Sequence, residues 1–296
     1  MPFAMVTEII SERQVPKPMR TIKIVADSSA NVSSLETVAF SSAPLKIVTD
    51  QKEFVDDSAL DLEQMVSFFT GYKGKSKTSC PNPSDWLDAF GDGEDIFCVT
   101  ITSGLSGSYN SACVAKQMYE SQHPDRRVYV IDSLSTGPEM KLIIEELESC
   151  IRKGMEYQTI CDHIARYTEK TGLVFMLESL KNFAANGRVS PAIAKIVGLL
   201  GIRIVGKASA QGTLEPMHKC RGQQRSLEAI LQHLQEAGLH RGKVRIDHCR
   251  NAAAAEALEQ LIHSRIPEVQ VQIGVCKGLC SYYAELGGLL VGYEKQ

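Results

Sequence analysis

The amino-acid sequence predicts an α/β protein with two domains of different character. In the N-terminal half, short apolar runs alternate with helical patterns, which indicates a doubly wound, mostly parallel sheet. In the C-terminal half, a hairpin pattern is mixed with helices, which is typical of an α+β domain with an open sheet. The length of 296 residues also favours two domains over one. We therefore expect an irregular extension in residues 1–20, an α/β domain in residues 21–155 and an α+β domain in residues 156–296.

The elements of the N-terminal domain follow from hydrophobic pattern and helix signals. The run Ile96–Ile101 is β-branched, aromatic and unbroken by charge, as in a strand buried on both faces. Asp61 is a helix N-cap, and Pro83 or Ser84 begins a further helix. The remaining expected strands are Thr21–Ala26, Ala43–Val48, Arg127–Ile131 and an edge strand within Lys52–Asp57, and the remaining expected helices are Val32–Phe40, one opening at Ser106–Ser108 and one from about Ser133 to Cys150.

The second half changes character at a helix over Tyr157–Lys170. Gln211–Gly212 lies between two strand-like runs and predicts a hairpin turn. The other expected helices are Leu180–Phe183, Ala192–Leu200, Gln223–Ala237 and Ala252–Ser264, and the other expected strands are Leu173–Met176, Ile202–Val205, Lys243–Asp247, Val269–Val275 and Leu289–Tyr293.

Composition narrows the classes of function. A net charge of −3 gives no reason to expect a nucleic-acid partner. The nine cysteines are odd in number and form no CxxC pair, and no signal peptide precedes them, so we expect reduced thiols in a cytoplasmic protein. We expect no metal site, because the seven histidines are dispersed and none has ligand spacing to a cysteine pair.

Polar turns follow several predicted strands at their carboxyl ends. These turns are Asp27–Ser29, Thr102–Ser106 and Asp132–Ser135. Ligands of parallel sheets bind at that edge, and a helix N-terminus there suits a phosphate or a carboxylate. Serine also caps helices by default, so an ordinary N-cap remains the alternative. Because three such turns fall at one edge, they favour a binding site.

The order of motifs along the chain resembles that of the DegV family. The matching segments are DSS near the N-terminus, TS-x-P-x-P, TSGLSGS-Y-x-SA after a strand, VIDS, LESLKNFAANGRVS and GTLEPMHKCRG. The resemblance runs from about Thr21 to Tyr293. It implies two α/β domains with a long-chain fatty acid buried between them, and no cofactor or metal. It also implies a non-catalytic, bacterial subunit in phospholipid synthesis that presents the acyl carboxylate to a fatty acid kinase and contacts the membrane peripherally during fatty-acid exchange.

The resemblance also implies residues that hold the carboxylate. Thr78 and Ser79 stand in the TS-x-P motif, and Ser28 stands in DSS. In SGLSGS, Ser106 is the best match for the key hydroxyl, and Ser103 with Gly104 is close behind, because the segment between the motifs is shorter than usual.

Further positions concern the kinase surface and the acyl chain. Arg188 in GRVS and Arg221 in KCRG match family arginines near the ligand exit and the kinase surface, although surface ion pairs are the alternative for both. The candidate residues lining the acyl chain are Ile193, Ile196, Val197 and Leu200, for which plain core packing is the alternative.

One segment departs from the family pattern. Many members carry His-x-Gly-Pro-Gly near the C-terminus, and that histidine also reaches the carboxylate. Here the segment Gly278–Gly288 has neither histidine nor proline. Ser281, Tyr282 or Tyr283 could supply a replacement donor.

Two other functions fit parts of the pattern. A serine hydrolase using Ser106 would place it on a strand–turn–helix elbow, but the G-x-S-x-G pattern is imperfect and no histidine follows a late strand convincingly; His248 comes nearest. A binder of nucleotides or sugar phosphates would explain the serines at the strand ends, but the chain lacks a Gly-rich phosphate loop.

Overall fold

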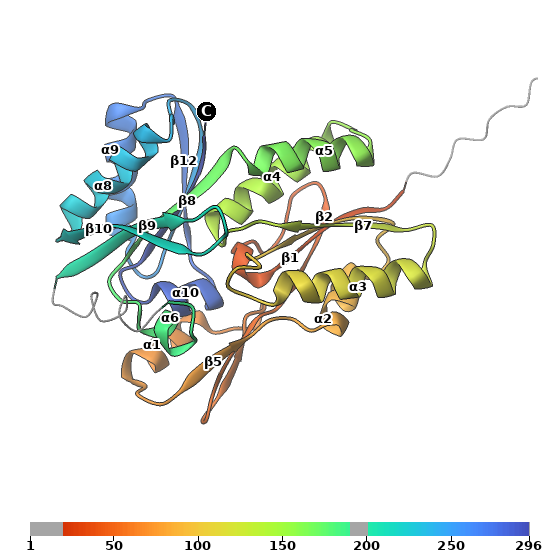
Figure 1. Cartoon of the computed structure of the whole chain (residues 1–296), viewed down its shortest axis with the longest axis horizontal. Coiled ribbons are helices and arrows are strands. Elements are labelled where there is room, and N and C mark those ends of the chain that lie inside the picture. The colour runs from red at the N-terminus through yellow and green to blue at the C-terminus, as the bar shows by residue number, and fades with distance from the viewer. Residues whose placement is uncertain (1–19, 190–200, 296) are drawn as a thin grey trace, which may run out of the picture.

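The computed structural model describes residues 20–189 and 201–295 of the chain (Figure 1). Its first sheet is parallel, with strand order β2-β1-β6-β7. These strands are β1 (Ile22–Asp27), β2 (Ala39–Ala43), β6 (Asp95–Thr100) and β7 (Arg127–Asp132). Helices α2 (Pro83–Phe90) and α3 (Ser108–Gln122) cover one face, and α4 (Pro138–Arg152) and α5 (Tyr157–Thr168) cover the other. The predicted doubly wound sheet is therefore confirmed.

A small antiparallel sheet lies beside the parallel one. Its order is β4-β3-β5, and the strands are β3 (Lys46–Thr49), β4 (Glu53–Val55) and β5 (Ser76–Ser79). Helix α1 (Leu62–Gly71) begins after Asp61, whose side chain accepts a hydrogen bond from the backbone of Gln64. The N-cap expected at Asp61 is present.

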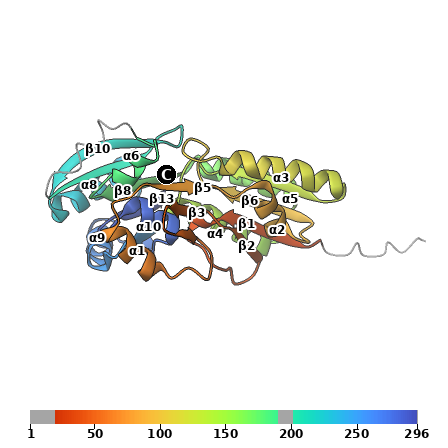
Figure 2. The same cartoon turned by 90° about the horizontal axis from the view of Figure 1, so that it is seen from below.

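The C-terminal sheet is mixed and open, as expected. Its order is β10-β9-β8-β13-β11-β12, and only β11 and β12 pair in parallel. The strands are β8 (Thr171–Leu177), β9 (Ile202–Ala208), β10 (Leu214–Arg221), β11 (Gly242–His248), β12 (Val269–Val275) and β13 (Leu289–Glu294). Helices α8 (Gln223–Glu236) and α9 (Ala252–Arg265) cover one face, and α6 (Lys181–Ala185) and α10 (Gly278–Ala284) lie at the other (Figures 1 and 2).

Two predictions in the N-terminal domain are wrong. The segment expected as a helix, Val32–Phe40, contains no helix and ends in β2, which pairs with β1. The single strand expected at Ala43–Val48 is divided between β2 and β3, which belong to different sheets. Pro44 stands at the division, and its missing N–H and fixed φ interrupt a strand.

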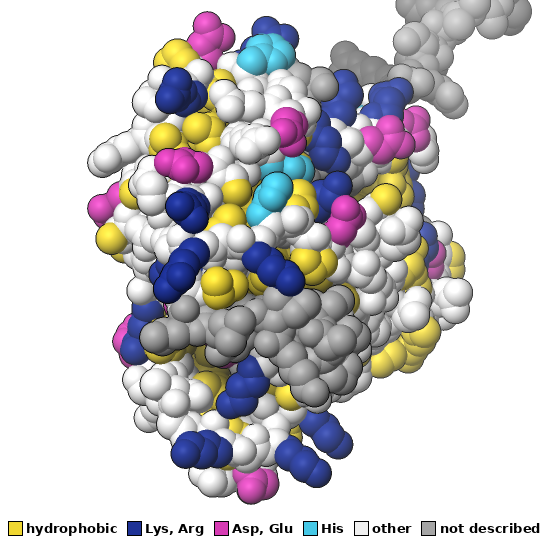
Figure 3. Space-filling model, turned by 60° about the vertical axis from the view of Figure 1, so that its left-hand side comes forward, with side chains coloured by type: hydrophobic (Ala, Val, Ile, Leu, Met, Phe, Trp, Pro, Cys, Tyr) yellow, Lys and Arg dark blue, Asp and Glu magenta, His cyan; other side chains and the backbone are white. Residues whose placement is uncertain are grey.

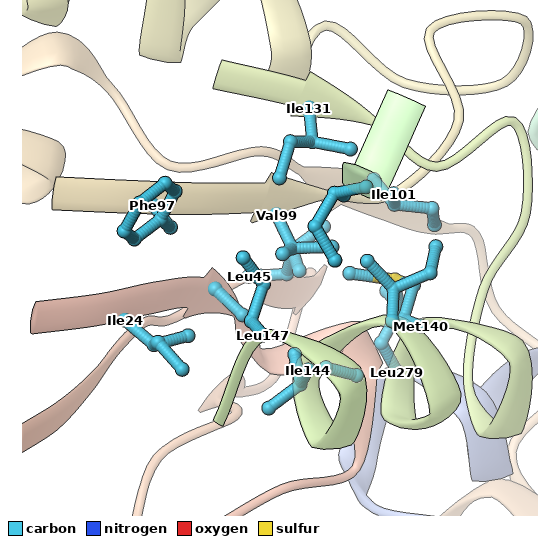
Figure 4. Packing of buried hydrophobic residues seen from close by; sticks show 14 of the residues in the cluster. Ile24, Leu45, Phe97, Val99, Ile101, Ile131, Met140, Ile144, Leu147 and Leu279 are labelled. Atoms are coloured by element: carbon cyan, nitrogen blue, oxygen red, sulfur yellow. The ribbon is translucent and has the colours of Figure 1, made fainter. Parts of the chain in front are cut away.

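Helix α4 packs against the centre of the parallel sheet. Figure 4 shows Met140, Ile144 and Leu147 of this helix beside Val99 and Leu45. The same cluster includes Ile160 and Ile164 of α5, so this helix joins the core of the N-terminal sheet. The domain boundary near residue 155 stays a prediction. Within the described residues, no helix combines the length and apolar character needed to cross a bilayer.

Candidate functional site

A cavity of about 300 Å³ lies between the carboxyl ends of the parallel sheet and the face of the mixed sheet that carries α10. Most of its wall is apolar. The lining side chains come from both halves of the chain: Leu45, Ile101, Leu105, Leu173, Phe175, Leu177, Phe183, Leu214, Leu279, Ala284 and Leu290. Such a wall suits an apolar ligand, because burial of each CH₂ group contributes about 0.8 kcal/mol.

Hydroxyl groups gather in one part of the wall. Thr78 on β5, Ser106 before α3 and Tyr283 on α10 all line the cavity. The Thr78 and Tyr283 hydroxyl oxygens are 2.7 Å apart and share a hydrogen bond. Each oxygen of such a pair keeps further capacity to donate or accept. The three side chains can therefore serve the polar head of a ligand whose tail lies among the apolar residues.

Arg188 brings a positive charge to this part of the cavity. It is half-buried, and its guanidinium donates to the backbone carbonyls of Leu105 (3.0 Å) and Asn186. Among the ion pairs formed by residues 20–189 and 201–295, none involves Arg188. A carboxylate in the cavity would supply a charge-assisted partner.

The N-terminus of α3 faces the same place. Its N-cap, Gly107, lines the cavity and provides no side-chain hydrogen bond to the helix. Ser106 Oγ accepts a hydrogen bond from the Ser108 backbone at 3.3 Å. The free N–H groups and the helix dipole favour an anion at this end.

Asn186 and Tyr282 connect β5 and α10, the elements that carry Thr78 and Tyr283. Asn186 accepts a hydrogen bond from the Thr78 backbone (3.1 Å) and donates to the Tyr282 hydroxyl (2.9 Å). The Tyr282 hydroxyl also lies 2.7 Å from Ser76 Oγ. The positions of β5 and α10 are thereby linked through side chains behind the cavity.

A buried carboxylate shapes the turn before α3. Asp27, at the end of β1, accepts hydrogen bonds from the Ile101 backbone (2.8 Å), from Ser108 Oγ (2.7 Å) and from the backbone and hydroxyl of Ser29. Burial raises the pKa of Asp27, and these donors work in the opposite direction. The family resemblance points to Ser28 in the DSS motif, but in the structure it is Asp27 that joins the ends of β1 and β6.

The candidate residues fall into two groups. Thr78, Ser79, Ser106, Arg188 and Tyr283 line the cavity. The remaining candidates are not among its described lining residues: Ser28, Ser103, Gly104, Arg221, Ser281 and Tyr282.

Their local contacts explain the second group. Ser28 Oγ accepts from the Leu45 backbone, and Ser281 Oγ donates to the Cys276 carbonyl. Ser103 is exposed, and its N–H donates to Asp132. Arg221 is exposed at the end of β10. The candidate acyl-chain residues Ile193, Ile196, Val197 and Leu200 lie outside the described residues.

Two thiols that the sequence motifs do not indicate, Cys80 and Cys280, also line the cavity. Burial raises the pKa of both, which keeps them neutral and suited to an apolar wall. No spacing signal in the sequence distinguishes them from the other cysteines. No histidine is among the described residues that line the cavity, so Ser106 has no partner there for a hydrolase triad.

Comparison with known proteins gives one consistent result. A profile of the DegV family matches residues 21–296. A DegV domain-containing protein of Streptococcus pneumoniae R6 is 43% identical over 278 residues, which cover 93% of this chain and 99% of that protein.

Two crystal structures are similar over the same range. One is the Streptococcus pneumoniae Fatty Acid Kinase (Fak) B3 protein loaded with linoleic acid, with 42% identity and a TM-score of 0.91. The other is a DegV family protein from Eubacterium eligens loaded with heptadecanoic acid, with 43% identity and a TM-score of 0.91. Each similarity covers 93% of this chain and 100% of the other. The fold and the extent of these matches show that this chain is a member of the DegV family.

Proposed function

We propose that the protein binds one long-chain fatty acid in the cavity between its two sheets. The observation that carries the proposal is that one cavity has a mostly apolar wall and, in one part, hydroxyl groups and an arginine. A fatty acid likewise consists of an apolar acyl chain and a charged carboxylate. The similar proteins that hold linoleic and heptadecanoic acid support this ligand class.

In this proposal, the carboxylate lies among Ser106, Thr78, Tyr283 and Arg188. The hydroxyls and the N-terminus of α3 donate hydrogen bonds, and Arg188 offsets the negative charge. Tyr283 takes the place of the histidine that many family members carry in the corresponding segment. Ser79, which also lines the cavity, is exposed and lies at its rim.

We further propose that the protein is a non-catalytic carrier that presents the carboxylate to a fatty acid kinase for acyl-phosphate formation. The name of the similar Streptococcus pneumoniae protein supports this kind of partner. Figure 3 shows the side of the molecule that comes forward from the left of Figure 1, where Lys and Arg side chains are interspersed with Asp and Glu. On β9, Arg203 and Lys207 form ion pairs with Glu178 and Glu215, whereas Arg221 is exposed at the end of β10. An exposed arginine suits a partner with phosphate or acidic groups. We place this role in the bacterial cytoplasm and in phospholipid synthesis, with peripheral membrane contact during fatty-acid exchange.

Native mass spectrometry tests the binding step. Protein purified from a bacterial host should carry one fatty acid, which denaturation releases for identification. Ser106→Ala and Thr78→Val should each bind the fatty acid about tenfold more weakly, because each removes a hydrogen bond to a charged group worth about 1.5 kcal/mol. Ser103→Ala is the matched control, since it removes a hydroxyl of the same turn outside the cavity, and it should retain as much as the wild type.

A comparison of ligands separates the carboxylate site from simple apolar uptake. Delipidated protein should bind a free fatty acid more tightly than its methyl ester, and Ser106→Ala should reduce that preference. Failure to bind fatty acids of any length would contradict the proposal. Equal affinity for acid and ester would contradict the placement of the carboxylate.

A further inference from the structure

A second cluster of reactive side chains lies between α4 and α5, away from the cavity. Glu146 and Cys150 stand one helical turn apart on α4, and His163 reaches them from α5. The ligand atoms of the three side chains all lie within 4.8 Å of one another. None of the three lines the fatty-acid cavity. No sequence motif marks this cluster, because His163 is brought to α4 only by the pairing of the two helices.

The separations are close to those that a metal ion requires. Glu146 Oε1 is 2.7 Å from His163 Nε2 and 4.0 Å from Cys150 Sγ. Around a tetrahedral Zn²⁺ with ordinary bond lengths, the O···N and O···S separations would be about 3.3 and 3.6 Å. Small side-chain rotations in opposite directions would therefore bring all three atoms into coordination. A thiolate, an imidazole and a carboxylate together suit zinc and its neighbours in the first transition series.

The side chains around the cluster suit a divalent cation in their charge and in their exposure to solvent. The Glu146 carboxylate and the Cys150 thiolate balance the two charges of a divalent ion. Lys243 lies 3.9 Å from Glu146 Oε2, the oxygen that does not face His163. That contact orients the carboxylate and leaves Oε1 for the metal. The His163 side chain is 37% exposed and that of Glu146 is 16% exposed, whereas Cys150 is buried, so the cluster meets solvent on the side of His163.

We propose that Glu146, Cys150 and His163 bind a divalent transition-metal ion, with Zn²⁺ the best match, and that water completes its coordination. The ion joins α4 to α5. Helix α4 contacts strands of both the parallel and the mixed sheet. A metal bound between α4 and α5 would therefore stabilise the packing of the helix that lies between the two sheets.

Cobalt titration of the full chain tests the site. After treatment with a chelator, the protein should bind one equivalent of Co²⁺ with a sulfur-to-cobalt charge-transfer band, and Zn²⁺ should displace the cobalt. Cys150→Ser should abolish the band, and His163→Gln should weaken binding by at least about tenfold. Cys161→Ser is the matched control, because Cys161 is a buried thiol of α5 outside the cluster, and it should leave the band unchanged.

A second measurement uses only the wild-type protein. Zn²⁺ should slow alkylation of Cys150, as read by mass spectrometry of peptides, without slowing that of Cys161. Absence of saturable cobalt and zinc binding would overturn the proposal. So would binding without a thiolate band, or zinc protection that does not distinguish the two thiols, because either would indicate adventitious ions.

Discussion

Asp27 illustrates how one side chain fixes the turn on which Ser106 stands. Its two carboxylate oxygens serve donors from Ser29, Ile101 and Ser108, which belong to three separate segments. Asp27 is 1% exposed, so water cannot replace these bonds when they are lost. A buried donor without a partner costs about 1–3 kcal/mol.

We therefore expect Asp27→Ala to lower the free energy of unfolding by about 3 kcal/mol or more, as measured by urea denaturation. The control is Asp88→Ala, because Asp88 is exposed on α2 and should change stability by less than about 0.5 kcal/mol. A loss below about 1 kcal/mol for Asp27→Ala would show that the turn is held by other contacts.

Glu139 is a second buried acid and offers a test with pH. Burial raises its pKa, and the hydrogen bond from Thr171 Oγ1 (2.8 Å) opposes that shift. Because its pKa is raised on folding, the folded state binds the proton more tightly than the unfolded chain. The free energy of unfolding therefore falls as the pH rises from the pKa of Glu139 in the unfolded chain, near 4, through its higher pKa in the folded protein.

Glu139→Gln removes this titration and keeps an acceptor for Thr171. The variant should gain stability relative to the wild type at pH 8 and lose that advantage at pH 4.5, measured as urea midpoints at both values. A difference between the two proteins that is independent of pH would contradict this account.

At the scale of elements, the hairpin of β9 and β10 closes one side of the cavity. Gly212 lies in its turn with a φ of +69°, and an added Cβ would stand 1.9 Å from Thr102 Oγ1. Gly104 in the facing turn is also close to the hairpin, since its added Cβ would lie 2.5 Å from the Gln211 carbonyl oxygen. The hairpin tip and the turn before α3 are therefore in close contact, with Gly212 against the Thr102 side chain and Gly104 against the Gln211 backbone.

Gly212→Ala should force these turns apart and speed the release of bound fatty acid. The matched control is Gly222→Ala, because Gly222 has a φ of +86° with nothing within 4 Å of an added Cβ. Gly222→Ala therefore introduces the same kind of backbone strain at a positive φ but no clash with a neighbouring turn. Stopped-flow exchange of a fluorescent fatty acid should show faster release only for Gly212→Ala, and equal rates for both variants would rule out closure by the hairpin.

Elements were predictable where local signals were strong. The run Ile96–Ile101 and the turn at Gln211–Gly212 have patterns that only one structure satisfies, and β6 and the β9–β10 hairpin follow them. The β2 strand was not predictable, because its exposed and half-buried residues show no alternation and it is fixed by pairing with β1. Of the hydroxyls predicted from motif resemblance, Thr78, Ser79 and Ser106 line the cavity, whereas Ser28 and Ser103 do not. Cys80 and Cys280 reach the cavity only through tertiary packing, which no motif reveals.

At the scale of the whole molecule, a buried ion pair joins the two sheets. Asp247 at the end of β11 is fully buried and accepts hydrogen bonds from Lys141 of α4 (2.8 Å) and from Asn31 (2.7 Å). Asn31 also accepts a bond from the Lys277 backbone before α10. No short sequence window reveals this link, since its members are far apart along the chain.

Asp247→Ala should cost about 3–5 kcal/mol in urea unfolding, because Lys141 and Asn31 lose their common buried partner. The Glu63–Arg250 ion pair offers a matched control that also joins distant segments but is exposed. Glu63→Ala should cost less than about 1 kcal/mol. Similar losses for the two variants would mean that burial of the Asp247 pair has little effect on stability.

A crystal structure of the protein with a bound long-chain fatty acid would test the proposed binding mode. We expect one acyl chain among Phe175, Leu177 and Leu290, with its carboxylate within hydrogen-bond distance of Ser106 Oγ and of Thr78 or Tyr283. A cavity that stays empty at saturating fatty acid, or a chain whose carboxylate lies away from Ser106 and Arg188, would contradict it.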